Sequence, residues 1–252
     1  MFRFLLNLIC PLYCAICRRP LEVDDGISLC EACRSAITTP DGGFCLRCGG
    51  RKFQRLDATG SCRRCMTTSF QFRRVIALGE YEHELRRTVL RMKTDRLGLL
   101  ATAVAAWLVV CRRNLLEEST TDVVVPMPMH RLRRWQRGVN NPDWLADEIA
   151  RRLERPVLRN VILRIRRTDL QFQLSRRNRT ANVSGAFAVV PRRQRLLKDK
   201  SVLLVDDILT TGATCNEAAA VLYAAGAKAV TVCVAARAEG HVLQQNEPVW
   251  VE

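Results

Sequence analysis

Two residue patterns in this chain are able to do chemistry: an acidic pair followed by a threonine-rich turn, and a series of regularly spaced cysteine pairs. The first lies in the stretch VLLVDDILTTGAT, Val202 to Thr214, where a short apolar run leads into Asp206 and Asp207. The segment Asn216 to Ala225 follows with helical spacing of its apolar residues. We therefore expect a strand, a loop and a helix N-terminus in succession.

A loop of this kind favours an anion, because free backbone N–H groups and the helix dipole point into it. The expected phosphate cradle consists of Thr210, Thr211, Gly212, Ala213 and Thr214. The two carboxylates would repel a second phosphate, but they would accept hydrogen bonds from a sugar diol or hold a hydrated Mg²⁺. A phosphorylated ribose satisfies both halves. The alternative is a purely structural capping box made by Thr214 and Glu217.

The second pattern is a row of four Cys-x-x-Cys pairs, which are Cys14/Cys17, Cys30/Cys33, Cys45/Cys48 and Cys62/Cys65. Two such pairs complete the four-sulfur shell of structural zinc, so eight thiolates predict two zinc ions. We prefer sequential pairing, first with second and third with fourth, because short loops close at lower entropy cost. A cross-braced arrangement of the first pair with the third is the alternative. Four sulfurs leave no open coordination position, so the module is structural or a binding surface.

Charge and composition narrow the possible partners. The chain has 252 residues and a formal net charge of +15, and nearly all of its basic residues are arginines. Arginine makes bidentate contacts to phosphate, so nucleic acid or a polyphosphate ligand is one interpretation, and solvated helix faces are the other. We find no apolar run of about 18 residues and no export signal, so we expect no membrane span and a cytoplasmic protein.

The elements that position these residues follow from periodicity. A composition shift near residue 70 divides the chain into a zinc-ribbon module, residues 1–70, and a second domain, residues 71–252. In the second domain, strand patterns alternate with helix patterns. The expected strands are 75–81, 122–129, 201–205 and 229–236, and the expected helices are 85–92, 97–111, 143–153 and 216–225. This alternation predicts an α/β fold with a mostly parallel sheet, whose ligands bind at the carboxyl ends of its strands.

With these elements in place, VLLVDDILTTGAT resembles the motif of type I phosphoribosyltransferases that binds 5-phosphoribosyl 1-pyrophosphate (PRPP). Three further stretches resemble the ComF/GntX family of competence-associated proteins: YEHELRRTVLRMK, PMPMHRLRRWQRGVNNPDWLA and QFQLSRRNRTANVSGAF. The resemblance implies that Asp206 and Asp207 contact the ribose hydroxyls of PRPP with Mg²⁺, and that Thr210 to Thr214 hold its 5′-phosphate. His83 and Asn141 depart from the family pattern, at positions where glycine and glutamine are more usual.

The resemblance also implies that the loop after the strand at 122–129 contacts pyrophosphate. In this chain, that loop offers His130, Arg131, Arg134, Arg137 and Gly138. A basic surface loop is the alternative interpretation. The arginine-rich segment 164–182 is either a lid over the site or a surface excursion, and the acceptor is selected by a hood that we expect to involve residues 157–167.

Two functions remain at this stage. One is a phosphoribosyltransferase of unknown acceptor that binds PRPP with Mg²⁺ and acts in natural transformation, as the family resemblance implies. The other is a non-enzymatic factor that handles single-stranded DNA with the zinc module and the arginine-rich surface, as a partner of the DNA-uptake machinery.

Overall fold

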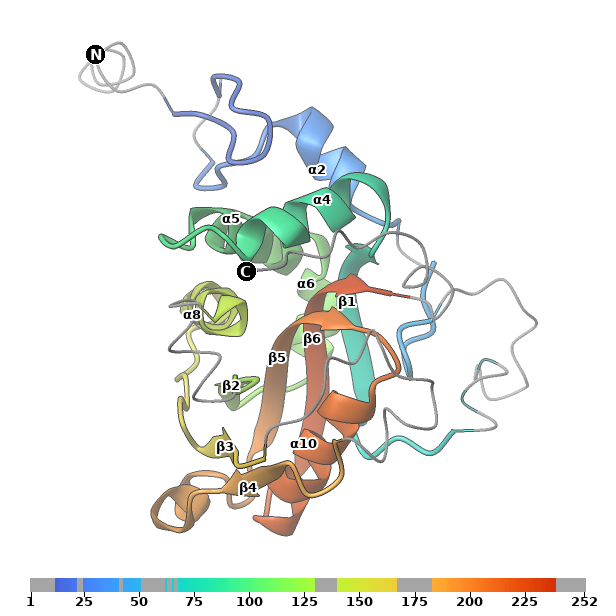
Figure 1. The fold of residues 1–252 in the computed structure, drawn as a ribbon, viewed down its shortest axis with the longest axis vertical. Helices are drawn as coiled ribbons and strands as arrows, with labels where there is room; N and C mark the ends of the chain where they lie inside the picture. The colour runs from blue at the N-terminus through green and yellow to red at the C-terminus, as the bar shows by residue number, and fades with distance from the viewer. Residues whose placement is uncertain are drawn as a thin grey trace.

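The structure is a computed structural model that describes residues 12–21, 25–40, 43–50, 62, 65, 68–129, 140–166 and 183–238. At its centre is a four-stranded sheet in the order β1-β6-β5-β2, with all three strand pairs parallel. The strands are β1 (Arg74–Glu80), β2 (Val123–Pro126), β5 (Ser201–Leu209) and β6 (Ala229–Arg237). Their carboxyl ends therefore meet at one edge of the sheet (Figure 1). This confirms the predicted α/β class.

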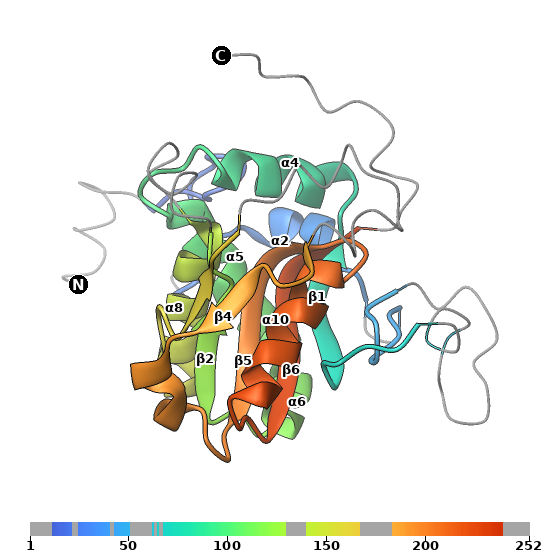
Figure 2. The same cartoon turned by 60° about the horizontal axis from the view of Figure 1, so that its bottom comes forward.

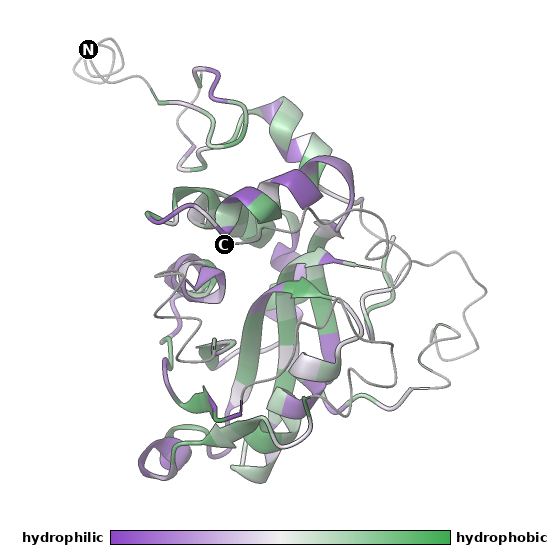
Figure 3. Ribbon diagram, in the orientation of Figure 1, coloured by the Kyte–Doolittle hydropathy of each residue, from purple (hydrophilic) through white to green (hydrophobic). Residues whose placement is uncertain are grey.

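Helices cover both faces of the sheet. Val124, Leu203 and Val205 pack in one cluster with α5 (Leu99–Cys111) and α8 (Asn141–Leu153), while Val202 and Leu204 pack in another with α10 (Ala213–Ala224). Because successive side chains of a strand point to opposite faces, a strand buried on both faces is apolar throughout, as β5 is from Val202 to Val205. Figure 3 shows the apolar colouring along β5 and β6.

Five smaller elements complete the domain. They are α4 (His83–Met92), α6 (Arg113–Glu118), an antiparallel pair made of β3 (Ile162–Arg164) and β4 (Phe187–Val189), and the 3₁₀-helix η2 (Pro191–Leu196). Figure 2 shows β4 beside α10. The β3–β4 pair was not predicted, because three-residue strands are too short for a period of two to be recognised. In the described part of the chain, no helix combines the length and apolarity needed to cross a membrane.

The structure moves two expected boundaries near the acidic pair. Strand β5 does not end at Val205 but continues to Leu209, because its pairing with β6 extends to Leu209 opposite Arg237. Helix α10 begins at Ala213, with Gly212 as its N-cap and no side-chain cap. The capping-box alternative is therefore wrong, and the Glu217 carboxylate instead accepts a hydrogen bond from the Gly185 N–H at 2.7 Å.

The first cysteine segment packs on the top of the domain in Figure 1, where α2 (Glu31–Ile37) lies beside α4. A Cβ at Gly79 of β1 would lie 2.5 Å from the Ile37 carbonyl oxygen, so only glycine admits the end of α2. Nearby, the buried Arg112 donates hydrogen bonds to the carbonyls of Ala77 and Leu78, both at 2.8 Å, and to that of Thr39. Residues 31–39 are thus part of the folded core.

His83 shows what the departure from the family pattern means locally. Its φ is +43°, in the left-handed region that favours glycine, at the point where α4 begins. The chain keeps this turn with a non-glycine residue. Asn141, at the other departing position, is buried at the start of α8.

Candidate functional site

The acidic pair lies at the carboxyl end of β5, in the middle of the sheet. The Asp206 Oδ1 atom accepts a hydrogen bond from the Asp207 N–H at 2.9 Å, and the Asp207 Oδ1 atom accepts one from the Ile208 N–H at 2.8 Å. Both side chains are half-buried.

The electrostatics of this pair favour a cation or a hydrogen-bond donor beside it. Burial, together with the negative charge of Asp207, raises the pKa of Asp206 well above its usual range. A bound divalent cation would offset that repulsion, and two carboxylates are the oxygen ligands that Mg²⁺ prefers. The donor set therefore fits Mg²⁺, which would be held by Asp206 and Asp207 together with oxygens of a ligand.

The predicted phosphate cradle is a tight turn between β5 and α10. Gly212 has φ +83°, and a Cβ there would lie 3.3 Å from the Phe70 ring, so the turn requires glycine. The Ala213 N–H is within 3.3 Å of the Thr211 Oγ1 atom. The turn opens directly into the first turn of α10, a helix of twelve residues, where N–H groups lack partners within the helix. The predicted cradle and the acidic pair are thus adjacent.

Three residues around the site were not singled out from the sequence. The Cys215 thiol lies 3.8 Å from Asp206 Oδ2, and burial raises its pKa well above the usual range. Burial raises the pKa of Asp206, and the positive charge of the Arg164 guanidinium offsets part of that rise. Arg237, at the end of β6, donates to the Thr210 carbonyl at 2.6 Å. Cys215 directly follows the loop in the chain, whereas Arg164 and Arg237 reach the site through long-range packing, for which the sequence carries no spacing signal.

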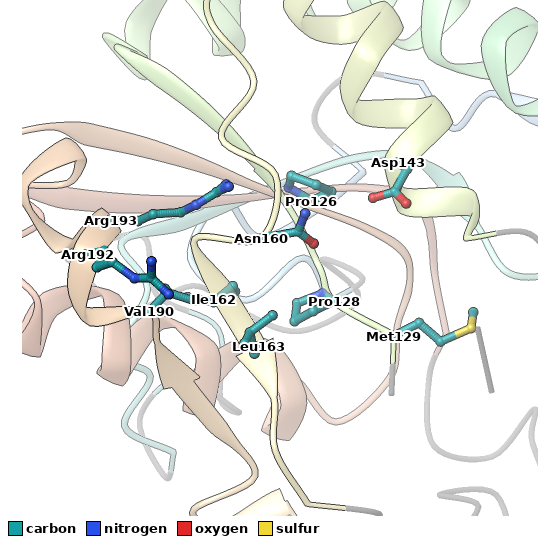
Figure 4. A pocket seen from close by; sticks show the side chains of 10 residues that line it. All are labelled: Pro126, Pro128, Met129, Asp143, Asn160, Ile162, Leu163, Val190, Arg192 and Arg193. Carbon is teal, nitrogen blue, oxygen red and sulfur yellow. The ribbon is translucent and has the colours of Figure 1, made fainter. Parts of the chain in front are cut away.

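A pocket of about 610 Å³ opens beside the end of β2 (Figure 4). We call it the β2-edge pocket; it is lined by Pro126, Pro128, Met129, Asp143, Asn160, Ile162, Leu163, Val190, Arg192 and Arg193. Pro126, which lines the pocket, pairs with Val205, the residue before Asp206. The pocket therefore lies at about the same height along the sheet as the acidic pair. Asn160, Ile162 and Leu163 belong to residues 157–167, where the acceptor hood was expected.

Other predicted site residues lie outside the described part of the chain. These are the five of the pyrophosphate loop, His130, Arg131, Arg134, Arg137 and Gly138, and most of the segment 164–182. Their roles stay predictions.

The eight predicted zinc ligands form two clusters with the sequential pairing. Within each of the sets Cys14/Cys17/Cys30/Cys33 and Cys45/Cys48/Cys62/Cys65, the four sulfurs lie within 4.8 Å of one another. Neighbouring sulfurs are 3.4 to 3.8 Å apart. Tetrahedral Zn–S bonds of about 2.3 Å require S···S distances of about 3.8 Å, so both clusters fit a zinc ion.

The backbone at the two clusters repeats one turn, the zinc knuckle. In the first knuckle, the Arg18 N–H donates to the Cys14 carbonyl at 2.9 Å, and in the second the Gly49 N–H donates to the Cys45 carbonyl at 2.7 Å. Arg18 and Gly49 both have positive φ, at +64° and +68°. Each knuckle thereby aims two sulfurs at one point.

Hydrogen bonding between neighbouring thiols of the second cluster shifts their pKa values in opposite directions. A hydrogen bond from Cys48 lowers the pKa of Cys45 to about 4, and the same contact raises the pKa of Cys48. One sulfur of the pair thus carries negative charge at neutral pH, and a dication would stabilise that charge and displace the remaining protons.

Two known domain families match different parts of the chain. Residues 5–66 match the double zinc ribbon domain, and residues 144–251 match the phosphoribosyl transferase domain. The N-terminal clusters are therefore two four-cysteine sites of the structural zinc type, and the sheet belongs to a phosphoribosyl transferase domain, as predicted.

Curated relatives extend the likeness over most of the chain. DNA utilization protein YhgH of Escherichia coli K12 is 31% identical over 228 residues, which cover 88% of this chain and 95% of that protein. Competence protein F of Haemophilus influenzae is 27% identical over 228 residues, which cover 89% of this chain and 96% of that protein.

Zinc content tests the two clusters. We expect about two zinc ions per chain, and about one after either Cys33→Ser or Cys48→Ser, because each substitution removes one ligand of a four-sulfur shell. Elemental analysis of the purified chain measures this. Cys111→Ser, outside both clusters, should keep two ions. A wild-type content of one or none would refute the eight-ligand assignment.

Proposed function

This chain belongs to the family of competence protein F and DNA utilization protein YhgH, and we propose that it binds PRPP with Mg²⁺. The observation that carries the proposal is the adjacency of a carboxylate pair and a helix-terminal anion loop at the carboxyl end of β5. The names of the relatives support a role in competence or DNA utilization. Thiolate zinc ligands need reduced cysteines, which supports a cytoplasmic protein.

In this proposal, each part of the ligand has its own partner. The backbone N–H groups and hydroxyls of residues 210–214 hold the 5′-phosphate, while Asp206 and Asp207 orient the ribose by accepting hydrogen bonds from its hydroxyls. Mg²⁺, when bound, neutralises charge on the pyrophosphate. The predicted pyrophosphate loop, with His130, Arg131, Arg134 and Arg137, would hold the leaving group.

Group transfer requires a place for an acceptor, and we assign it to the β2-edge pocket. Its floor is apolar, and it carries the guanidinium groups of Arg192 and Arg193 as well as the polar side chains of Asp143 and Asn160. A partly apolar acceptor with an anionic group suits that lining. The reaction proposed is transfer of the phosphoribosyl group to such an acceptor.

The acidic pair is tested by substitution. Asp206→Asn together with Asp207→Asn should lower PRPP affinity at least about tenfold in the presence of Mg²⁺. The neutral asparagine side chains cannot hold the cation, and they accept weaker hydrogen bonds from the ribose diol than carboxylates do. Isothermal titration calorimetry measures the affinity. Glu117→Gln on α6, an exposed carboxylate of the same charge, is the control and should bind normally. An unsubstituted chain that shows no PRPP binding would sink the proposal.

The raised pKa of Asp206 predicts a pH dependence. Since its protonated form persists above the ordinary titration range of an aspartate, affinity for PRPP with Mg²⁺ should fall as pH is lowered through that raised pKa. A calorimetric series from about pH 8 to about pH 5 measures this. Asp207→Asn removes the neighbouring charge and should move the midpoint to lower pH. Identical midpoints in the two proteins would contradict the assignment, because titration of the PRPP phosphates is common to both.

A second function is favoured by the surface around η2. We define the η2 basic strip as Arg192, Arg193, Arg195, Lys198 and Lys200, all exposed. The strip precedes β5 in the chain, and two of its members, Arg192 and Arg193, also line the β2-edge pocket. Five cations within nine residues suit a phosphate backbone, which supports contact with single-stranded DNA.

The strip is tested by charge removal. Arg192→Gln, Arg193→Gln and Arg195→Gln together should weaken single-stranded DNA binding and flatten its dependence on salt, because each lost phosphate contact reduces counterion release. The matched control replaces Arg87, Arg113 and Arg151, which are equally cationic and exposed, with glutamine. Equal losses in the two triple variants would show that net charge, and not the strip, binds DNA.

A further inference from the structure

The second zinc knuckle, Cys45–Gly50, packs against the sheet beneath the phosphate loop. The Val75 N–H at the start of β1 donates to the Leu46 carbonyl at 2.9 Å. A Cβ at Gly49 would lie 2.8 Å from Val75 Cγ1 and 3.2 Å from Arg237 Cδ, so glycine is required for this contact. The knuckle is therefore in direct contact with β1 and with the side chain at the end of β6.

Arg237 connects this knuckle to the phosphate loop. It is 1% exposed, and its Nε donates to the Cys48 carbonyl at 3.2 Å. The Nη1 of the same guanidinium donates to the carbonyls of Leu209 at 2.9 Å and of Thr210 at 2.6 Å. One buried cation thus joins a zinc-ligand residue to the first residue of the loop. Its rigid planar shape fixes the relative position of these carbonyls.

Arg47 makes a second connection from within the same knuckle. Its guanidinium donates to the Phe70 carbonyl at 2.6 Å and to the Phe72 carbonyl. The two phenyl rings stack with centroids 4.9 Å apart, and both face Gly212 of the phosphate loop. Beside them, the Gln71 N–H donates to the side-chain oxygen of Asn216 in the first turn of α10, at 2.5 Å.

The first zinc knuckle provides the internal comparison. Its contacts to the domain go to α4, where the Arg91 guanidinium donates to the Ile16 carbonyl at 2.8 Å and to the Ala15 carbonyl at 3.3 Å. These contacts do not involve the loop at 210–214. The two zinc sites therefore have the same ligand chemistry but different neighbours.

We propose that Arg237 and Arg47 are positioning residues that couple the zinc-filled second knuckle to the phosphate loop. When zinc fills the second cluster, it holds the Cys48 carbonyl and the Arg47 side chain in place. The Cys48 carbonyl then fixes Arg237 against Thr210, and Arg47 fixes the phenyl rings that face Gly212. Zinc in the second site and ligand in the loop then stabilise each other, and linkage makes the effect reciprocal. Zinc in the first site has no such effect.

Hydrogen exchange of the loop amides in the ligand-free full chain tests the coupling without reference to any ligand. Exchange of residues 210–214 should rise about tenfold in Arg237→Gln and in Cys48→Ser, because charge-assisted hydrogen bonds that order the loop are lost. Arg47→Gln should also raise the exchange of these residues. Because the Arg47 side chain is only partly buried, this variant replaces Arg237→Gln in the test if Arg237→Gln does not fold. Arg91→Gln, which removes the contact of α4 with the first knuckle, and Cys33→Ser, which removes a ligand of the first zinc site, are matched controls and should leave loop exchange unchanged.

The reciprocal arm rests on the proposed function. PRPP with Mg²⁺ should slow zinc release to a chromogenic chelator in Cys33→Ser, which keeps the second site, and leave it unchanged in Cys48→Ser, which keeps the first. Loop exchange that is unchanged in Arg47→Gln and Cys48→Ser would overturn the coupling, as would equal effects of the two cysteine variants. Failure of the unsubstituted chain to bind PRPP would instead overturn the proposed function, and the exchange result would still decide the coupling.

Discussion

Two neighbouring carboxylates near the end of a buried strand repel each other, and this repulsion adds to burial in raising the pKa of Asp206. Asp206 and Asp207 cannot both lie in apolar surroundings as free anions, and the raised pKa of Asp206 reflects this. The helix terminus of α10 lies on one side of the pair, and Arg164 and Arg237 bring positive charge near it. Such an arrangement is poised for a ligand that carries its own cation and hydroxyl groups.

The zinc module is a structural part of this arrangement. Buried arginines attach it at two places, with Arg112 bonded to the carbonyls of Thr39, Ala77 and Leu78, and Arg237 bonded to those of Cys48 and Thr210. A guanidinium suits this role because it satisfies several carbonyls at once in a fixed geometry. The arginine-rich composition thus has two physical origins. Some arginines join the modules inside the fold, and others, such as those of η2, face solvent.

The parts of this account that were predictable from sequence are those carried by local pattern. The cysteine spacing gives both zinc clusters with their sequential pairing, and the β5–loop–α10 unit follows from one run of residues. Long-range contacts were not predictable. Nothing in the sequence near Arg237 shows that it reaches both Cys48 and Thr210, and the short strands β3 and β4 carry too little periodicity. The end of β5 was placed too early because aspartates are rare in strands, and here pairing with β6 overrides that preference.

The measurement that tests the central claim most directly is a crystal structure of the full chain with PRPP and Mg²⁺. The account predicts the 5′-phosphate on the backbone N–H groups of residues 211–214 and the ribose diol within hydrogen-bond distance of Asp206 and Asp207. A ligand bound elsewhere, or a phosphate loop without ligand at saturating PRPP, would contradict it.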